Sequence, residues 1–98
     1  MIKRKANAQW TDTVEKGGGT LELESGSFQG NYSFGSRFKD SAGTNPEELI
    51  GAAHAGCFSM AFSLMLEQAG FPSKTVDTSA TVSFDPENLA ITTIELNT

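Results

Sequence analysis

The pattern of apolar and polar positions divides the chain into three parts. In the first third, apolar residues alternate with polar ones, as at Ala8 and Trp10 and again at Leu21 and Leu23. Such alternation is typical of strands with one dry face. A third strand is predicted over residues 32–38, where aromatic residues lie two or four positions apart. These segments together predict a three-stranded antiparallel meander.

Three consecutive glycines, residues 17–19, separate the first two predicted strands. Glycine reaches positive φ without steric cost, so this run predicts the turn between them. It does not predict a nucleotide site, because the Gly-Lys-Ser/Thr sequence of a phosphate-binding loop is absent.

The middle third predicts one long helix. Asn45 suits the N-cap, Pro46 suits the first helical position, and two glutamates, Glu47 and Glu48, favour the positive end of the helix dipole. Gly70, with a proline two positions later, predicts the helix end. Between these limits the residues are apolar in nearly every direction, so this helix needs cover on all sides.

The last third predicts two more strands, over residues 76–84 and 89–96, with a turn at residues 85–88. The fold class is therefore α+β, with an N-terminal meander, a long central helix and following antiparallel strands. A chain of 98 residues is expected to form a single domain, residues 1–98. Its strands can cover one side of the helix, so we expect a second copy of the chain to cover the rest in a homodimer.

Charge and cysteine content narrow the function classes. The net charge of −5 argues against binding to nucleic acid, since a phosphate backbone requires a basic surface. The N-terminal basic residues precede a segment too polar for a signal peptide, and the apolar helix contains His54 and many small residues. We therefore expect no membrane span and a cytoplasmic location. With one cysteine, neither an internal disulfide nor a cysteine-based zinc site can form.

Residues 44–64 carry a specific resemblance. They contain an Asn-Pro-Glu-Glu-Leu start, an Ala-Ala-His-Ala run and a Cys-Phe-Ser-Met segment. This stretch resembles the central helix of the OsmC/Ohr family, the osmotically inducible protein C and organic hydroperoxide resistance proteins, and is nearest the OsmC branch. The similarity extends upstream to Gly35-Ser-Arg-Phe and downstream through residues 76–96.

The resemblance implies a thiol-dependent peroxidase that reduces organic hydroperoxides without metal, haem or other cofactor. It implies that Cys57 is the peroxidatic cysteine, Arg37 the active-site arginine and Glu47 the acid that partners the arginine. The chemistry agrees, because the thiolate is the reactive species and a nearby guanidinium raises the thiolate fraction. A carboxylate holds the fork of an arginine through charge-assisted hydrogen bonds. The apolar residues Phe58, Met60 and Phe62 would suit the alkyl part of the peroxide.

Each of these residues also has a simpler interpretation. A lone cysteine in an apolar helix is often a small buried hydrophobe, which would make the chain a non-catalytic dimerising module. Arg37 alone suits a strand surface, and Glu47 alone suits a helix N-terminus. His54 shares a helix face with Cys57, but no orienting acid is evident for a cysteine hydrolase, so packing explains it better.

Helix geometry constrains the predicted site. Glu47 and Cys57 are ten positions apart, about 15 Å along a straight helix. Either the helix breaks near Gly51 or Gly56, or the acid that serves Cys57 comes from elsewhere. A site at a subunit interface would solve this problem, and the resemblance implies intertwined dimers with interfacial active sites.

The sequence departs from the family at its C-terminal side. Family members usually continue through a second helix that carries a second cysteine, which resolves the sulfenic acid. No second cysteine is present in the 98 residues. The strand-like pattern up to Thr98 favours truncation over a naturally short member. We expect an external thiol to resolve the oxidised Cys57 instead.

Overall fold

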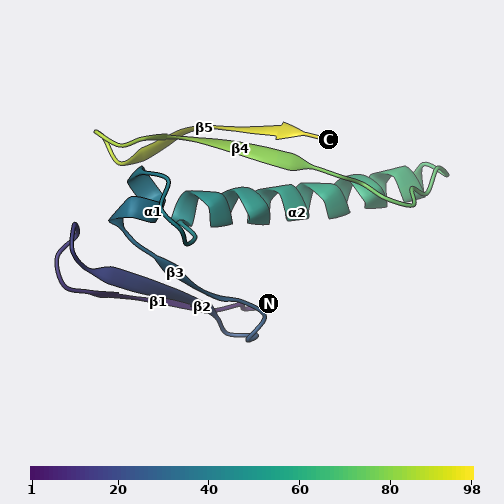
Figure 1. Ribbon diagram of the computed structural model, residues 1–98. Helices are drawn as coiled ribbons and strands as arrows, with labels where there is room; N and C mark the ends of the chain where they lie inside the picture. Colours follow the sequence, from purple (N-terminus) through teal and green to yellow (C-terminus); the bar gives the residue numbers. More distant parts are fainter. The chain divides into compact units, whose positions relative to one another are not determined.

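The computed structural model describes residues 1–98 and contains two compact units, Met1–Pro46 and Glu47–Thr98. The α+β class predicted from the sequence is confirmed. In chain order the elements are β1 (Ala6–Thr11), β2 (Gly18–Leu23), β3 (Gln29–Tyr32), α1 (Phe34–Phe38), α2 (Pro46–Gln68), β4 (Ser79–Asp85) and β5 (Ala90–Asn97) (Figure 1).

The first unit is built on the predicted meander, in which β1, β2 and β3 pair antiparallel in sequence order. The register places Gly19 between Trp10 and Tyr32, whose ring centroids are 5.2 Å apart. A Cβ on Gly19 would lie 2.5 Å from the Tyr32 ring and 2.7 Å from the Trp10 ring. Glycine at this position therefore allows the two aromatic rings to meet across the middle strand.

The predicted turn lies before the glycine run rather than on it. Gly18 and Gly19 belong to β2, and none of the three glycines has a positive φ. The chain reverses over residues 14–16, the positive φ of 72° belongs to Asp12, and the Gly17 amide donates to the Thr13 carbonyl at 2.7 Å. The glycines are explained by close approach, since a Cβ on Gly17 would clash with the Thr11 carbonyl oxygen.

The prediction of a strand over residues 32–38 was wrong, because β3 ends at Tyr32 and α1 follows. Ser33 is the N-cap and forms a capping box with Ser36: each serine hydroxyl accepts a hydrogen bond from the other's backbone amide, at 2.8 and 3.1 Å. Phe34 and Phe38 stand one helical turn apart, with ring centroids at 4.9 Å. The four-residue aromatic spacing therefore reflects a helix and not a strand.

The helix α2 lies in the second unit from Glu47 onward, and its limits agree with the sequence. Pro46 occupies the first helical position and both glutamates lie in the first turn. After Gln68, Gly70 has a φ of 91°, its amide donates to the Glu67 carbonyl at 3.0 Å, and the Phe71 amide donates to the Leu66 carbonyl at 2.8 Å. These two bonds form a Schellman cap, which explains the termination at glycine.

The hairpin of β4 and β5 runs alongside α2 (Figure 1) and covers a stripe of small residues on it. Val82 lies 3.1 Å from where a Cβ on Gly51 would sit, and the Ser59 hydroxyl donates to Thr78 Oγ1 at 2.7 Å. This stripe, defined as Gly51, Ala55, Ser59 and Ser63, is buried or half-buried. β4 starts three residues later than predicted and β5 one residue later, and the turn between them occupies residues 86–89.

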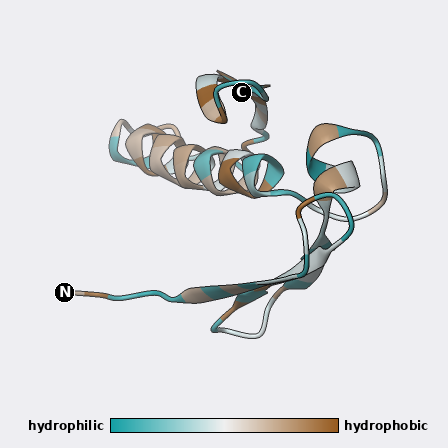
Figure 2. Cartoon of the chain, turned by 90° about the vertical axis from the view of Figure 1, so that its left-hand side faces the viewer, coloured by the Kyte–Doolittle hydropathy of each residue, from teal (hydrophilic) through white to brown (hydrophobic).

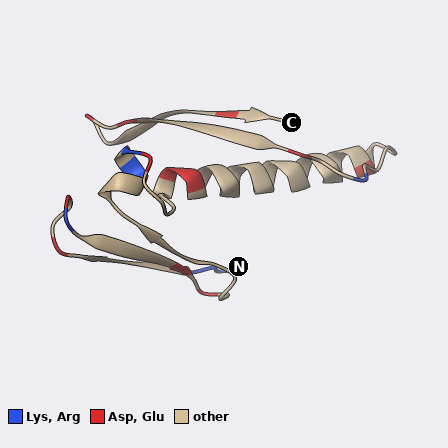
Figure 3. Ribbon diagram, in the orientation of Figure 1, with Lys and Arg blue, Asp and Glu red and all other residues tan.

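The remaining surface of α2 is apolar and open. No hydrophobic side chain of the chain is buried, and Met60, Met65 and Leu64 are 79%, 66% and 51% exposed. Apolar colouring continues along most of the helix (Figure 2), and charge is confined to its two ends (Figure 3). By length and composition alone, α2 would suffice to cross a membrane, a property that the core helices of soluble proteins share.

Candidate thiol site

Cys57 is exposed on α2 and faces away from the hairpin. It is two positions from Ala55 and two from Ser59, which turns it about 160° around the helix from the covered stripe. A shallow hollow beside it is lined by side chains up to about three helical turns onward. These are Met60, Ala61, Ser63, Leu64 and Glu67.

The thiol is therefore accessible in this chain and sits on an apolar helix face. The chain by itself does not bury Cys57, so the buried structural cysteine of the non-catalytic alternative would require a second chain over this face of α2. Of the three apolar residues assigned to the alkyl group, Met60 lines the hollow beside Cys57. Phe58 and Phe62 stack on each other with ring centroids 6.1 Å apart.

Glu47 lies in the first turn of α2 and is 8% exposed. The helix is continuous through Gly51 and Gly56, so of the two alternatives for the site, a helix break near either glycine is excluded. The acid and the thiol of one chain are therefore separated by about 15 Å along the helix axis, beyond the reach of a direct contact.

Arg37 belongs to the first unit and occupies the last turn of α1. Its guanidinium carbon lies 5.4 Å from the centroid of the Phe38 ring, a cation–π distance. The residue is half-buried at the rim of a hollow of about 220 Å³. The other residues of this aromatic hollow are Trp10, Val14, Tyr32, Ser33, Phe34 and Phe38.

The aromatic hollow was not foreseen from the sequence, which placed residues 32–38 on a predicted strand. The sequence signal for it was the four-residue spacing of Phe34 and Phe38, whereas Trp10 and Tyr32 meet because both pair with Gly19 of the middle strand. Combined with the adjacent Arg37, these rings make a small apolar cup with one cation at its edge. Such a cup suits an apolar molecule that carries an electron-rich polar group.

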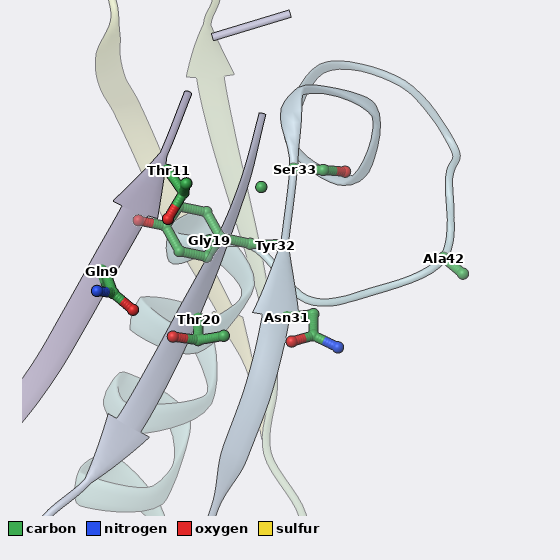
Figure 4. Close-up of a pocket in the computed structure, with 9 residues that line it drawn as sticks. Gln9, Thr11, Gly19, Thr20, Asn31, Tyr32, Ser33 and Ala42 are labelled. Carbon is green, nitrogen blue, oxygen red and sulfur yellow. The ribbon is translucent and has the colours of Figure 1, made fainter. Parts of the chain in front are cut away.

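The opposite face of the meander carries a second hollow, of about 380 Å³. Gln9, Thr20 and Asn31 lie side by side there on the three strands (Figure 4). No charged side chain lines it. It therefore offers hydrogen bonds but no group that would activate a thiol or a peroxide.

The fold and the thiol define a class: an α+β protein with a solvent-accessible, unpaired cysteine on its long central helix. The family model described as OsmC-like protein matches residues 38–98, which include Glu47 and Cys57 and begin one residue after Arg37. This chain belongs to the OsmC family. It is 52% identical to Peroxiredoxin OsmC of Escherichia coli (strain K12) over an alignment of 98 residues that covers 97% of this chain and 68% of that protein. The identity and coverage are the same for Peroxiredoxin OsmC of Shigella flexneri.

Proposed function

We propose that this protein is a thiol-dependent peroxidase that reduces organic hydroperoxides through Cys57. The observation that carries the proposal is the exposed cysteine on the central helix of a chain that belongs to the OsmC family. The relatives named above are peroxiredoxins by name, and peroxiredoxins act through a cysteine thiolate.

The reaction is a two-electron transfer from sulfur to the peroxide. The thiolate attacks the distal oxygen of the hydroperoxide, the S–O bond forms, and the O–O bond breaks. The sulfur keeps the transferred oxygen and the hydroperoxide proton as a sulfenic acid, and the alkoxide that leaves takes a proton from solvent to become the alcohol. An external thiol then attacks the sulfenic sulfur and releases water, and a second thiol reduces the resulting mixed disulfide.

We propose that Arg37 and Glu47 serve this thiol as a pair. Arginine is always charged and presents a fork of donors, which suits it to hold a thiolate and the peroxide oxygens together. The aromatic hollow at Arg37 supports the proposal, since it offers apolar walls to the organic part of the peroxide within reach of the cation. Because α2 is unbroken, Glu47 cannot contact Cys57 of its own chain, and we propose that the two chains of a dimer complete each site.

The proposed dimer follows from what covers α2. The hairpin covers the small-residue stripe, and the large apolar side chains lie outside it. A contiguous apolar surface of this kind marks an interface, and a second copy offers the same surface in return. Sedimentation at micromolar concentration should therefore give a dimer. Met65→Lys, on the open face, should shift it to monomer, whereas Ile2→Lys on the N-terminal arm should not; a folded monomeric wild type contradicts the proposal.

The function is tested by peroxide consumption. The wild-type protein with excess dithiothreitol should consume cumene hydroperoxide, and one equivalent of peroxide without reductant should form a sulfenic acid on Cys57. Cys57→Ser should abolish both, since its hydroxyl has no comparable nucleophilicity at neutral pH. Ser59→Ala, two positions along the same helix, is the matched control and should retain activity. Equal consumption by wild type and Cys57→Ser would refute the proposed function.

A further inference from the structure

Ser36 precedes Arg37 in α1 and is the most deeply buried polar residue, at 5% exposure. Its hydroxyl accepts a hydrogen bond from the Ser33 amide at 2.8 Å and donates to the Thr44 carbonyl at 2.7 Å. Its own amide donates to the Ser33 hydroxyl at 3.1 Å, and its carbonyl accepts from Asn45 Nδ2 at 3.1 Å. Every polar group of Ser36 is therefore used within the first unit.

These bonds tie α1 to the segment that returns from it. The returning segment, residues 41–45, is also hydrogen-bonded to β3 and to α1. The Thr44 amide donates to the Asn31 carbonyl at 2.9 Å, and the Ser41 amide donates to the Gly35 carbonyl at 3.3 Å. A helix of five residues is not stable by itself, because one or two turns do not repay the nucleation cost. The conformation of α1 is thus imposed by its cap and by the Ser36 bonds.

Arg37 depends on the same turn. Consecutive helix positions are rotated by about 100°, so Ser36 faces the return segment while the next residue points elsewhere. The guanidinium of Arg37 lies over Phe38 at the rim of the aromatic hollow. A rotation or fraying of α1 would displace this guanidinium, because its backbone is fixed only one residue away from the Ser36 bonds.

We propose that Ser36 is a positioning residue for the peroxidase reaction. Its hydroxyl, bonded to the Thr44 carbonyl, holds α1 in the orientation that directs the Arg37 guanidinium to the aromatic hollow. The inference rests on the proposed function, since it concerns the rate only if Arg37 acts in that reaction. A small misplacement of a group that orients the reactants costs about tenfold to a hundredfold in rate.

The test is a double-mutant cycle read by the rate of cumene hydroperoxide consumption. Ser36→Ala should slow the reaction by about tenfold, and Ser36→Thr, which keeps the hydroxyl, should recover most of the rate. In the Arg37→Ala background, Ser36→Ala should cause no further slowing, because the group it positions is gone. A merely structural role would slow both backgrounds alike. Ser25→Ala, which removes a turn hydroxyl bonded to Ser27 in the same unit, is the control and should keep the wild-type rate.

The outcomes separate this inference from the proposed function. A wild-type protein without peroxidase activity refutes the proposed function itself. If the wild type is active and Arg37→Ala is slow but Ser36→Ala keeps the wild-type rate, the positioning role alone is overturned. The same holds if the two slowing factors multiply in the double variant. If Ser36→Ala does not fold, Ser33→Ala, which removes the other half of the capping box, is measured in the same two backgrounds, with the same outcomes.

Discussion

Glu47 and Cys57 lie on one unbroken helix, ten positions apart, so about 15 Å and about 80° of rotation separate them. A carboxylate at one end of α2 therefore acts on the thiol of the same chain only through other residues. If two chains complete each site, Glu47 of one chain serves Cys57 of the other.

This arrangement predicts complementation between inactive variants. Glu47→Gln and Cys57→Ser should each lose activity alone. Mixed after dissociation and reassociation, they should regain about a quarter of the wild-type activity, since half of the dimers are mixed and each has one intact site. Peroxide consumption by the mixture measures this, and a mixture as inactive as its components shows that one chain supplies both residues.

Removal of the Arg37 charge should slow the reaction of the Cys57 thiol with alkylating reagents. If Arg37 contacts the Cys57 thiolate in the proposed site, its guanidinium stabilises the thiolate, so Arg37→Ala should slow iodoacetamide alkylation of Cys57 at neutral pH by about tenfold or more. Arg37→Lys keeps a charge without the planar fork and should recover part of the rate. Arg4→Ala removes the same charge from the N-terminal arm and should change little. Equal slowing by Arg37→Ala and Arg4→Ala would mean that net charge alone matters.

Two glycines of the second unit should respond oppositely to the same substitution. Gly70 has a φ of 91°, which an L-residue adopts at a cost of about 1 to 2 kcal/mol, so Gly70→Ala should lower the free energy of unfolding by that amount. Gly56 lies inside α2 with nothing near its missing Cβ, so Gly56→Ala should raise it by about 0.5 to 1 kcal/mol. Urea unfolding of both variants measures this. Destabilisation at both positions would mean that the space beside Gly56 is occupied.

The Asp85 carboxyl, at the turn between β4 and β5, should have a pKa below its ordinary value. Asn88 Nδ2 donates to the Asp85 carboxylate at 2.8 Å and the Glu87 amide donates to it at 2.9 Å, and these bonds lower the pKa of Asp85 from its ordinary value of 3.8. Because the folded-state pKa is lowered, the stabilisation is present above 3.8 and disappears as the pH falls through the folded-state value.

Carbon-detected NMR of the Asp85 carboxyl should therefore give a midpoint below 3.8. Asn88→Ala removes the bond with the largest effect and should raise this midpoint, whereas Asn97→Ala at the end of β5 should leave it unchanged. A midpoint that is insensitive to Asn88→Ala would assign the lowering to the backbone amides alone.

The sequence predicted α2 well because its limits are local. A proline at the first position and a glycine at the αL cap act through the backbone of their own residues, so Pro46 and Gly70 could be recognised without tertiary information. The separation of Glu47 from Cys57 also followed from helix rise alone. Features that depend only on residues close together in the sequence can therefore be predicted from the sequence alone.

The misassigned elements depend on neighbours distant in sequence. Gly19 is explained by two aromatic rings that reach it from the adjacent strands, and Ser36 by its bond to the Thr44 carbonyl. The capping box that starts α1 has a serine at its third position where glutamate or glutamine is usual, which hid a helix of five residues. The aromatic hollow likewise exists only after the register of the meander has brought Trp10 and Tyr32 together.

The exposure of Met60 and Met65 has a consequence for how oxidation is read. Thioethers exposed to peroxide gain one oxygen, as a sulfenic acid does, and the two modifications have equal mass. Trypsin leaves both methionines and Cys57 in a single peptide, residues 40–74, because no lysine or arginine lies between Lys39 and Lys74. A mass increase of sixteen daltons (roughly one oxygen) on that peptide is thus assigned to a sulfenic acid on Cys57 only when treatment with dimedone also gives an adduct at Cys57. Methionine sulfoxide on the open face of α2 would turn the apolar surface proposed for the dimer contact into a polar one.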